Sequence, residues 1–158
     1  MEQCPIDNQQ KYENYKTQFQ RLNRALANDF NLEAMFIEYA IMEDRSESIL
    51  RHSEYWEAYL KSRKGREPNI DSKIRYIKKC AENKKSVLNK YFSDDLLDQL
   101  LVWKEDRNRL IHALLKQQFE HDEIYGLATR GNDLVKELRN RAGSCNRAVE
   151  RQRVKEVK

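Results

Sequence analysis

The chain has 158 residues, of which 39% are apolar and 35% are charged, and its net charge is +4. No stretch approaches the roughly 18 consecutive apolar residues of a membrane-spanning helix, and the first ten residues lack the apolar segment of a secretory signal. Four glycines and two prolines are few for a protein rich in strands or loops. We therefore expect an all-α, cytoplasmic protein without membrane contact, folded as a single domain over residues 1–158.

Two helices are predicted in the N-terminal part of the chain, over residues 8–28 and 32–62. In both, apolar residues recur every three or four positions, which is the period of one face of an α-helix. Asn31 is the candidate N-cap of the second helix. The inward stripe of that helix is expected to contain Leu32, Phe36, Tyr39, Ile49, Leu50, Trp56 and Leu60.

A linker with Gly65 and Pro68 over residues 62–69 separates the second helix from a third, predicted over 71–91 with Asp71 as its N-cap. A fourth helix is predicted to begin at the capping sequence 93–95 and to run to about residue 118. A fifth is predicted over 122–153, with a basic end that frays from about residue 150. Long helices with short connections favour an up-and-down bundle of four to five helices. Their narrow apolar stripes favour a homodimer.

Positive charge is concentrated in two blocks of the sequence. Residues 61–90 contain 11 Lys and Arg residues against three Asp and Glu residues, and residues 136–158 contain eight against three. The rest of the chain is acidic. Two interpretations stay open: the basic blocks bind a polyanion such as RNA, or they are solvated helix faces.

Cysteines and histidines are few and widely spaced. They are Cys4, Cys80 and Cys145, and His52, His112 and His121. No CxxC or HExxH spacing is present. We therefore expect reduced thiols, no structural metal and no cofactor.

Arg107 interrupts the apolar stripe of the fourth predicted helix, where leucine would be expected. That stripe contains Leu96, Leu100, Trp103, Arg107, Leu110 and Leu114. Asn108 and His112 are one helical turn apart and flank the stripe. A guanidinium at such a position needs a partner, because burying an unpaired polar group is costly.

Glu43 and Glu47 are the candidate partners of Arg107. Glu43 continues the apolar stripe of the second helix, so an ion pair with Arg107 would compensate both charges. In this structural interpretation Asn108 and His112 simply face water. In the functional interpretation, the three polar residues form a site.

The sequence from Arg107 to His112 resembles the motif of the HEPN superfamily (higher eukaryotes and prokaryotes nucleotide-binding). That motif consists of an arginine, a polar residue that is often Asn, Asp or His, and a histidine four to six positions after the arginine. Arg107, Asn108 and His112 match it, and the resemblance covers about residues 70–130. Ala113 and Leu114 depart from the many members that carry a polar or aromatic residue after the histidine.

The resemblance implies a metal-independent endoribonuclease. In that chemistry the 2′-OH of RNA attacks the adjacent phosphorus and leaves a cyclic phosphate. His112 would serve as the acid or base, Arg107 would stabilise the developing charge, and Asn108 would orient the histidine's neighbour or a phosphate oxygen. The resemblance also implies a dimer that brings two motifs together across a two-fold axis.

A second function class stays open beside the ribonuclease. Some HEPN proteins are non-catalytic modules that bind RNA or proteins, and this chain would then be a helical homodimer of that kind. The roles that are common in this family further suggest a function in toxin–antitoxin systems or defence, with an antitoxin or another regulatory protein as partner.

RNA contacts are expected on the exposed face of the third predicted helix. The basic side chains there would hold the phosphate backbone with little sequence preference. Tyr76 would either stack on a base or be partly buried. The expected RNA-binding residues are Lys73, Arg75, Tyr76, Lys78, Lys79, Lys84 and Lys85.

Overall fold

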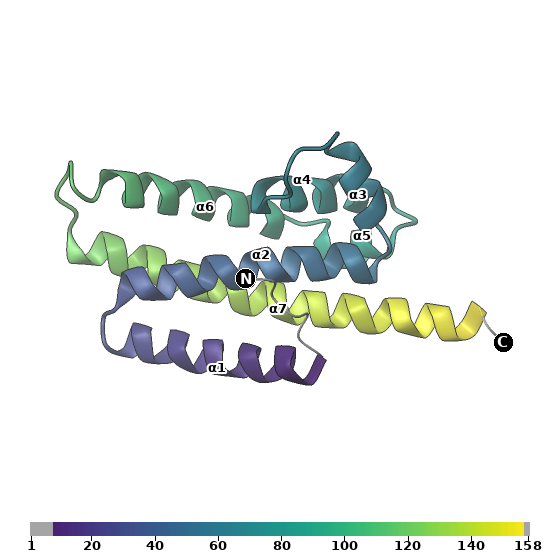
Figure 1. The fold of residues 1–158 in the computed structure, drawn as a ribbon, viewed down its shortest axis with the longest axis horizontal. Helices are drawn as coiled ribbons and strands as arrows, with labels where there is room; N and C mark the ends of the chain where they lie inside the picture. Colours follow the sequence, from purple (N-terminus) through teal and green to yellow (C-terminus); the bar gives the residue numbers. More distant parts are fainter. Residues whose placement is uncertain (1–7, 157–158) are drawn as a thin grey trace.

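A computed structural model describes residues 8–156, and every regular element among them is an α-helix (Figure 1). The expected all-α class is therefore confirmed. Seven helices replace the expected four or five, because two of the predicted helices are each divided in two. The helices are α1 (Asn8–Ala27), α2 (Asn31–His52), α3 (Trp56–Ser62), α4 (Ile70–Ala81), α5 (Val87–Phe92), α6 (Leu96–Ala113) and α7 (His121–Glu156).

The predicted helix over 32–62 is wrong in its length, because a turn separates α2 from α3. Glu54 adopts a left-handed backbone conformation with φ of 65°, and the N–H of Tyr55 donates back to the carbonyl of Leu50 at 2.9 Å. This hydrogen bond closes the end of α2 as a C-terminal capping turn does. Glycine usually marks such a turn, so the sequence around Glu54 gives no warning of it.

The predicted helix over 71–91 is likewise divided, into α4 and α5. Between them, the side chain of Asn83 accepts a hydrogen bond from the N–H of Lys85 at 3.0 Å. Ser86 then caps α5 by accepting from the N–H of Leu88 at 3.2 Å. Both contacts are local side-chain alternatives to the helical hydrogen-bond pattern.

Both predicted N-caps are also wrong. Phe30 is at the N-cap of α2, and Asn31 lies inside that helix with a buried side chain. Asn69, two residues before Asp71, caps α4 by accepting from the N–H of Ser72 at 2.9 Å. The Ser72 hydroxyl accepts in return from the N–H of Asn69 at 3.3 Å, which completes a capping box.

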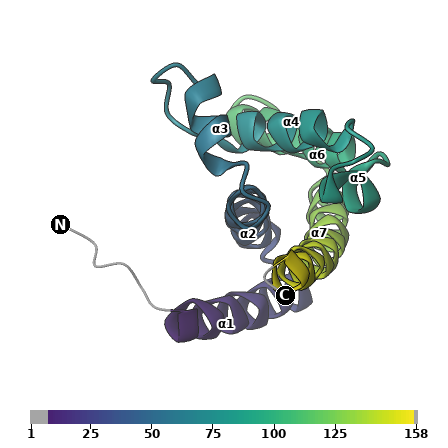
Figure 2. The same cartoon turned by 90° about the vertical axis from the view of Figure 1, so that its right-hand side faces the viewer.

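Helix α2 lies at the centre of the molecule, with α1, α4 and α7 packed around it (Figure 2). The longer helices α1, α2, α6 and α7 run in alternating directions, while α3, α4 and α5 gather at one end of the group (Figure 1). Helix α7 continues past residue 150 to Glu156, and Arg153 donates to the carboxylate of Glu54 at 2.8 Å. The largest side chains of the shared core are Trp103, Tyr59, Phe92, Leu22, Met35 and Met42.

One side of α2 is not covered by another helix (Figure 2). Leu32 and Phe36 lie on the α2 surface with 42% and 69% of their area exposed, although the sequence predicts both to face inward. The buried face of α2 contains Met35 and Met42 instead. The expected stripe is confirmed at Ile49 and Leu50, which are fully buried, and is wrong at Leu32 and Phe36, because the first turns of α2 have apolar residues on both sides.

Candidate functional site around Arg107

Arg107 contacts an aromatic ring rather than an acid. Its guanidinium carbon lies 4.6 Å from the centre of the Tyr39 ring, which connects α6 to α2. One terminal nitrogen donates to the side-chain oxygen of Asn108 at 3.1 Å. The side chain is half-buried, and its Nε atom is buried with no hydrogen-bond partner in the described part of the chain. The cation–π contact with Tyr39 explains why the stripe tolerates an arginine.

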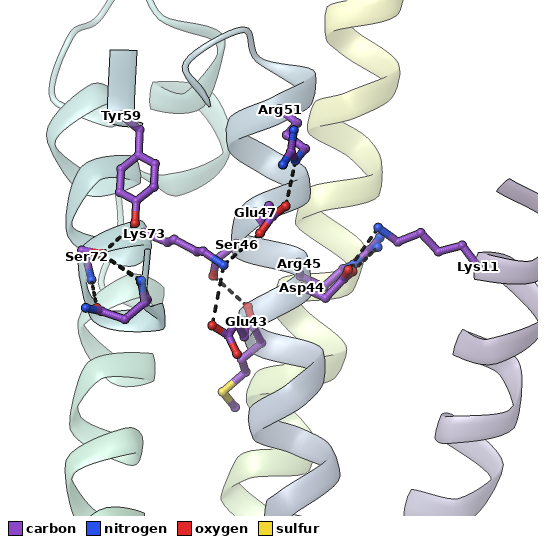
Figure 3. Close-up of polar contacts among 12 residues, drawn as sticks. Lys11, Glu43, Asp44, Arg45, Ser46, Glu47, Arg51, Tyr59, Ser72 and Lys73 are labelled. Carbon is purple, nitrogen blue, oxygen red and sulfur yellow. Dashed lines mark hydrogen bonds and ion pairs between the residues drawn. The ribbon is translucent and has the colours of Figure 1, made fainter. Parts of the chain in front are cut away.

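Glu43 and Glu47 pair with Lys73, so the expected ion pair with Arg107 is wrong. The Lys73 ammonium lies 2.9 Å from Glu47 Oε2 and 3.6 Å from Glu43 Oε1 (Figure 3). Glu47 also accepts from Arg51 at 2.8 Å. Burial raises the pKa of Glu47, but the hydrogen bonds from Lys73 and Arg51 outweigh it and hold that pKa below its ordinary value. These acids therefore stabilise the contact between α2 and α4.

His112 lies exposed in the last turn of α6. No residue among 8–156 forms a hydrogen bond or ion pair with it, so its side chain is free to meet a ligand. His112 is five positions after Arg107, which places the two side chains about 140° apart around the helix axis at 100° per residue. The side chain of Asn108 points in a direction between these two. Within one chain, therefore, Arg107 and His112 do not point toward the same place.

Exposed apolar side chains surround this end of α6. Ile111 follows Arg107 by one turn and is 37% exposed, while Leu115 is fully exposed. The motif therefore lies beside exposed apolar side chains at the end of α6.

The structure does not bring the expected RNA-binding residues to the motif. α5 and the end of α4 lie toward the start of α6, where Lys78 pairs with Asp98, and His112 is at the other end of this helix of about 27 Å (Figure 1). The start of α4 lies nearer the motif, because Asp71 pairs with Lys104, three residues before Arg107. Any RNA that contacts both regions must extend along the molecule.

Lys73 is wrong as an RNA contact, because its side chain is buried between α2 and α4. Two other basic residues of the set are paired: Arg75 with Asp71 at 3.1 Å, and Lys78 with Asp98 at 2.6 Å. The remaining lysines, Lys79, Lys84 and Lys85, are exposed.

Tyr76 is half-buried, as one of its two interpretations expects. Its ring meets that of Tyr59 edge to face, with 5.5 Å between the centroids. Burial raises the pKa of its hydroxyl, and the neighbouring Cys80 and Tyr55 add to the effect.

Glu38 is a buried acid that no sequence pattern indicates. Its side chain is fully buried, and neither carboxylate oxygen has a hydrogen-bond partner among residues 8–156. Burial, and then the charge of Asp133, raise the pKa of Glu38 to about 9. At neutral pH this side chain is therefore a neutral acid. Nothing in its sequence context distinguishes it from the exposed acids of α2.

Gly131 provides the space that Glu38 occupies. A β-carbon at this position would overlap the Glu38 carboxyl and lie 2.7 Å from Nε1 of Trp103, which donates to the Leu127 carbonyl at 2.9 Å. The close approach of α7 to α2 and α6 thus depends on the missing side chain. No sequence pattern indicates the buried acid beneath Gly131.

Replacing Gly131 with alanine is expected to lower the free energy of unfolding by about 1–3 kcal/mol, because the core here has no room for a methyl group. Gly126→Ala in the same helix is the matched control, since nothing lies within 4 Å of its added β-carbon. That change should stabilise the helix by about 0.5–1 kcal/mol. Urea denaturation of both variants measures the difference. Equal effects would show that the α7 contact is not tight.

Comparison of the chain with protein-family models, with curated proteins and with solved structures gives no match. Among residues 8–156, no helix has the length and apolarity to cross a membrane. The same residues contain no group of three or more His, Cys, Asp or Glu side chains placed to hold a metal ion.

Proposed function

We propose that this chain is a metal-independent endoribonuclease of HEPN type. The observation that carries the proposal is the placement of Arg107, Asn108 and His112 in the last two turns of α6, with His112 exposed and unpartnered in the described chain. An exposed histidine can exchange a proton with a bound RNA, and the half-buried guanidinium on the same helix supplies positive charge for a phosphate.

The proposed chemistry divides between two kinds of group. His112 accepts the proton of the 2′-OH as that oxygen attacks phosphorus, or gives a proton to the departing 5′-oxygen. Arg107 stabilises the negative charge on the phosphorane oxygens. The contact with Tyr39 and the hydrogen bond to Asn108 hold the guanidinium in place, so little ordering is needed when RNA binds.

A second copy of the chain would complete the site. Arg107 and His112 diverge by about 140° on one helix, and acid–base catalysis of this reaction uses two proton-transfer groups. Two copies related by a two-fold axis through the α6 ends would supply two histidines and two arginines. The exposed apolar side chains of Ile111 and Leu115 lie where such a contact would form.

Leu115→Asp is expected to separate the proposed dimer into monomers, because it would bury a charge in the interface. Leu115 is fully exposed in the single chain, so folding of the monomer should be retained. Light scattering after gel filtration measures the mass of each form. Tyr12→Asp, which changes an exposed residue on α1, is the control and should stay dimeric. A wild-type monomer at all concentrations would contradict the dimer.

The test of the ribonuclease is cleavage of a labelled structured RNA in excess EDTA. Wild type should leave 2′,3′-cyclic phosphate ends, and His112→Ala should leave the RNA intact. The exposed apolar surface near the motif favours one alternative, a non-catalytic homodimer that binds RNA or a protein. Absence of cleavage by the wild type would favour that alternative.

A further inference from the structure

A hollow that is separate from the motif on α6 lies between α1 and α7, with α2 at its base. Its volume is about 530 Å³, which is within the range of small-molecule sites. Figure 2 shows α1 on the side of α2 away from α4 and α6, so this hollow is distant from the motif on α6. It is lined by Lys11, Tyr12, Tyr15, Lys16, Phe19, Gln20, Asn23, Arg45 and Arg139.

The lining of the hollow has more positive charge than the structure neutralises. The Asp44 carboxylate lies 3.0 Å from Lys11 and 2.7 Å from Arg45, and it is the acid that both of them share (Figure 3). Hydrogen bonds from Arg45 and Lys11 outweigh burial and hold the pKa of Asp44 below its ordinary value, so it is ionised. Lys16 and Arg139 have no acidic partner among residues 8–156. Four cations around one carboxylate leave a concave surface that attracts anions.

Aromatic rings hold two of these cations in position. The Arg45 guanidinium lies 4.2 Å from the centre of the Tyr15 ring, and that of Arg139 lies 4.6 Å from the centre of Phe19. Such stacking leaves the guanidinium edges free to donate hydrogen bonds. The hollow is therefore partly preorganised for an anion.

The end of the hollow at Tyr12 suits a flat ring. Tyr12 is 63% exposed, and its ring is open for stacking. Lys16 follows Tyr12 by one helical turn, so a ligand that stacks on the ring can place an anionic group beside the ammonium. A nucleotide joins a stacking face to its phosphates in this way.

We propose that this hollow binds a nucleotide, with its phosphates on Lys16 and Arg139 and its base against Tyr12. The ligand is either a free nucleoside polyphosphate or the phosphorylated end of an RNA strand, since both present the same chemistry. This site does not depend on the proposed ribonuclease activity, because it shares no residue with the α6 motif.

Isothermal titration of the full chain with ATP tests the proposal. The double variant Lys16→Glu/Arg139→Glu should weaken ATP binding by about tenfold or more, because it removes two charge-assisted contacts. Lys61→Glu/Arg151→Glu makes the same change in charge at exposed positions outside the hollow and should bind as wild type does. No binding of ATP at millimolar concentration would overturn the proposal. Equal losses in both double variants would also overturn it, because they would show a general effect of charge.

Two further titrations identify what the hollow recognises. Tyr12→Ala should weaken ATP binding while leaving the weaker binding of inorganic phosphate unchanged, and equal losses for both would contradict base stacking. A short RNA with a 5′-phosphate that displaces ATP, where its dephosphorylated form does not, would identify the RNA end as the ligand. Failure of both RNAs to displace ATP would identify a free nucleotide.

Discussion

His112→Ala is expected to reduce RNA cleavage by about 100-fold or more, which is the range that one general acid or base contributes. The melting temperature should change by less than about 2 °C, because the side chain is exposed and makes no hydrogen bond or ion pair with residues 8–156. A large loss of activity without loss of stability is the signature of a functional residue. Cleavage rates in EDTA and thermal denaturation of the same preparations provide the two measurements.

His121→Ala is the matched control for His112→Ala. His121 is also an exposed histidine, at the start of α7, where it stacks on Tyr125 with 6.1 Å between the ring centroids. Its replacement should leave the cleavage rate unchanged. Cleavage that persists in His112→Ala at the wild-type rate would show that a contaminant or another residue is responsible.

Arg107 should respond differently from His112, because it has a structural contact as well as a proposed catalytic one. Arg107→Ala removes the contact with Tyr39 and should lower both activity and stability. Arg107→Lys keeps the charge but loses the planar group that stacks on the ring and binds phosphate through two donors. Stability that falls in both variants with unchanged cleavage would assign Arg107 a purely structural role.

The free energy of unfolding is expected to fall steadily as the pH rises from about 5 to 9, because of Glu38. Its pKa is about 9 in the folded chain and has an ordinary value of 4.5. Below the ordinary value the carboxyl is protonated in both states. Above it the unfolded state loses the proton while the folded state keeps it, so rising pH favours unfolding, by up to about 1.4 kcal/mol per pH unit.

Glu38→Gln should remove most of this pH dependence, since glutamine has a similar shape and does not ionise. Urea denaturation at several pH values between 5 and 9 gives the slope for each protein. The difference between wild type and variant isolates the contribution of Glu38, because the two proteins share every other ionisable group. Glu33→Gln, an exposed acid of α2 that pairs with Arg21 at 3.4 Å, is the control and should keep the wild-type slope. Identical slopes for wild type and Glu38→Gln would contradict a buried neutral acid.

The helical class, the linker at Gly65 and most of the core followed from the sequence. Helical periodicity and the scarcity of glycine and proline act locally, so they can be recognised without knowing which helices meet. The buried faces of α4, α6 and α7 lie largely where their apolar residues predict. For example, Ile74, Leu100 and Val135 are fully buried.

The helix breaks at Glu54 and at 82–86 are closed by local hydrogen bonds, but neither contains the glycine or proline that usually marks a break in a sequence. The uncovered side of α2 was decided by the tertiary structure, and so were the partners of the charged side chains. The sequence paired Arg107 with Glu43 and Glu47 only because their charges are opposite. In the folded chain, Lys73 of α4 forms the ion pairs with both acids. Arg107 contacts the ring of Tyr39 instead. Because that ring carries no net charge, a search of the sequence for opposite charges does not predict the contact. The packing of the helices decides which polar groups are buried together in the low-dielectric interior. The same packing buries Glu38 beside Gly131 and keeps its carboxyl neutral.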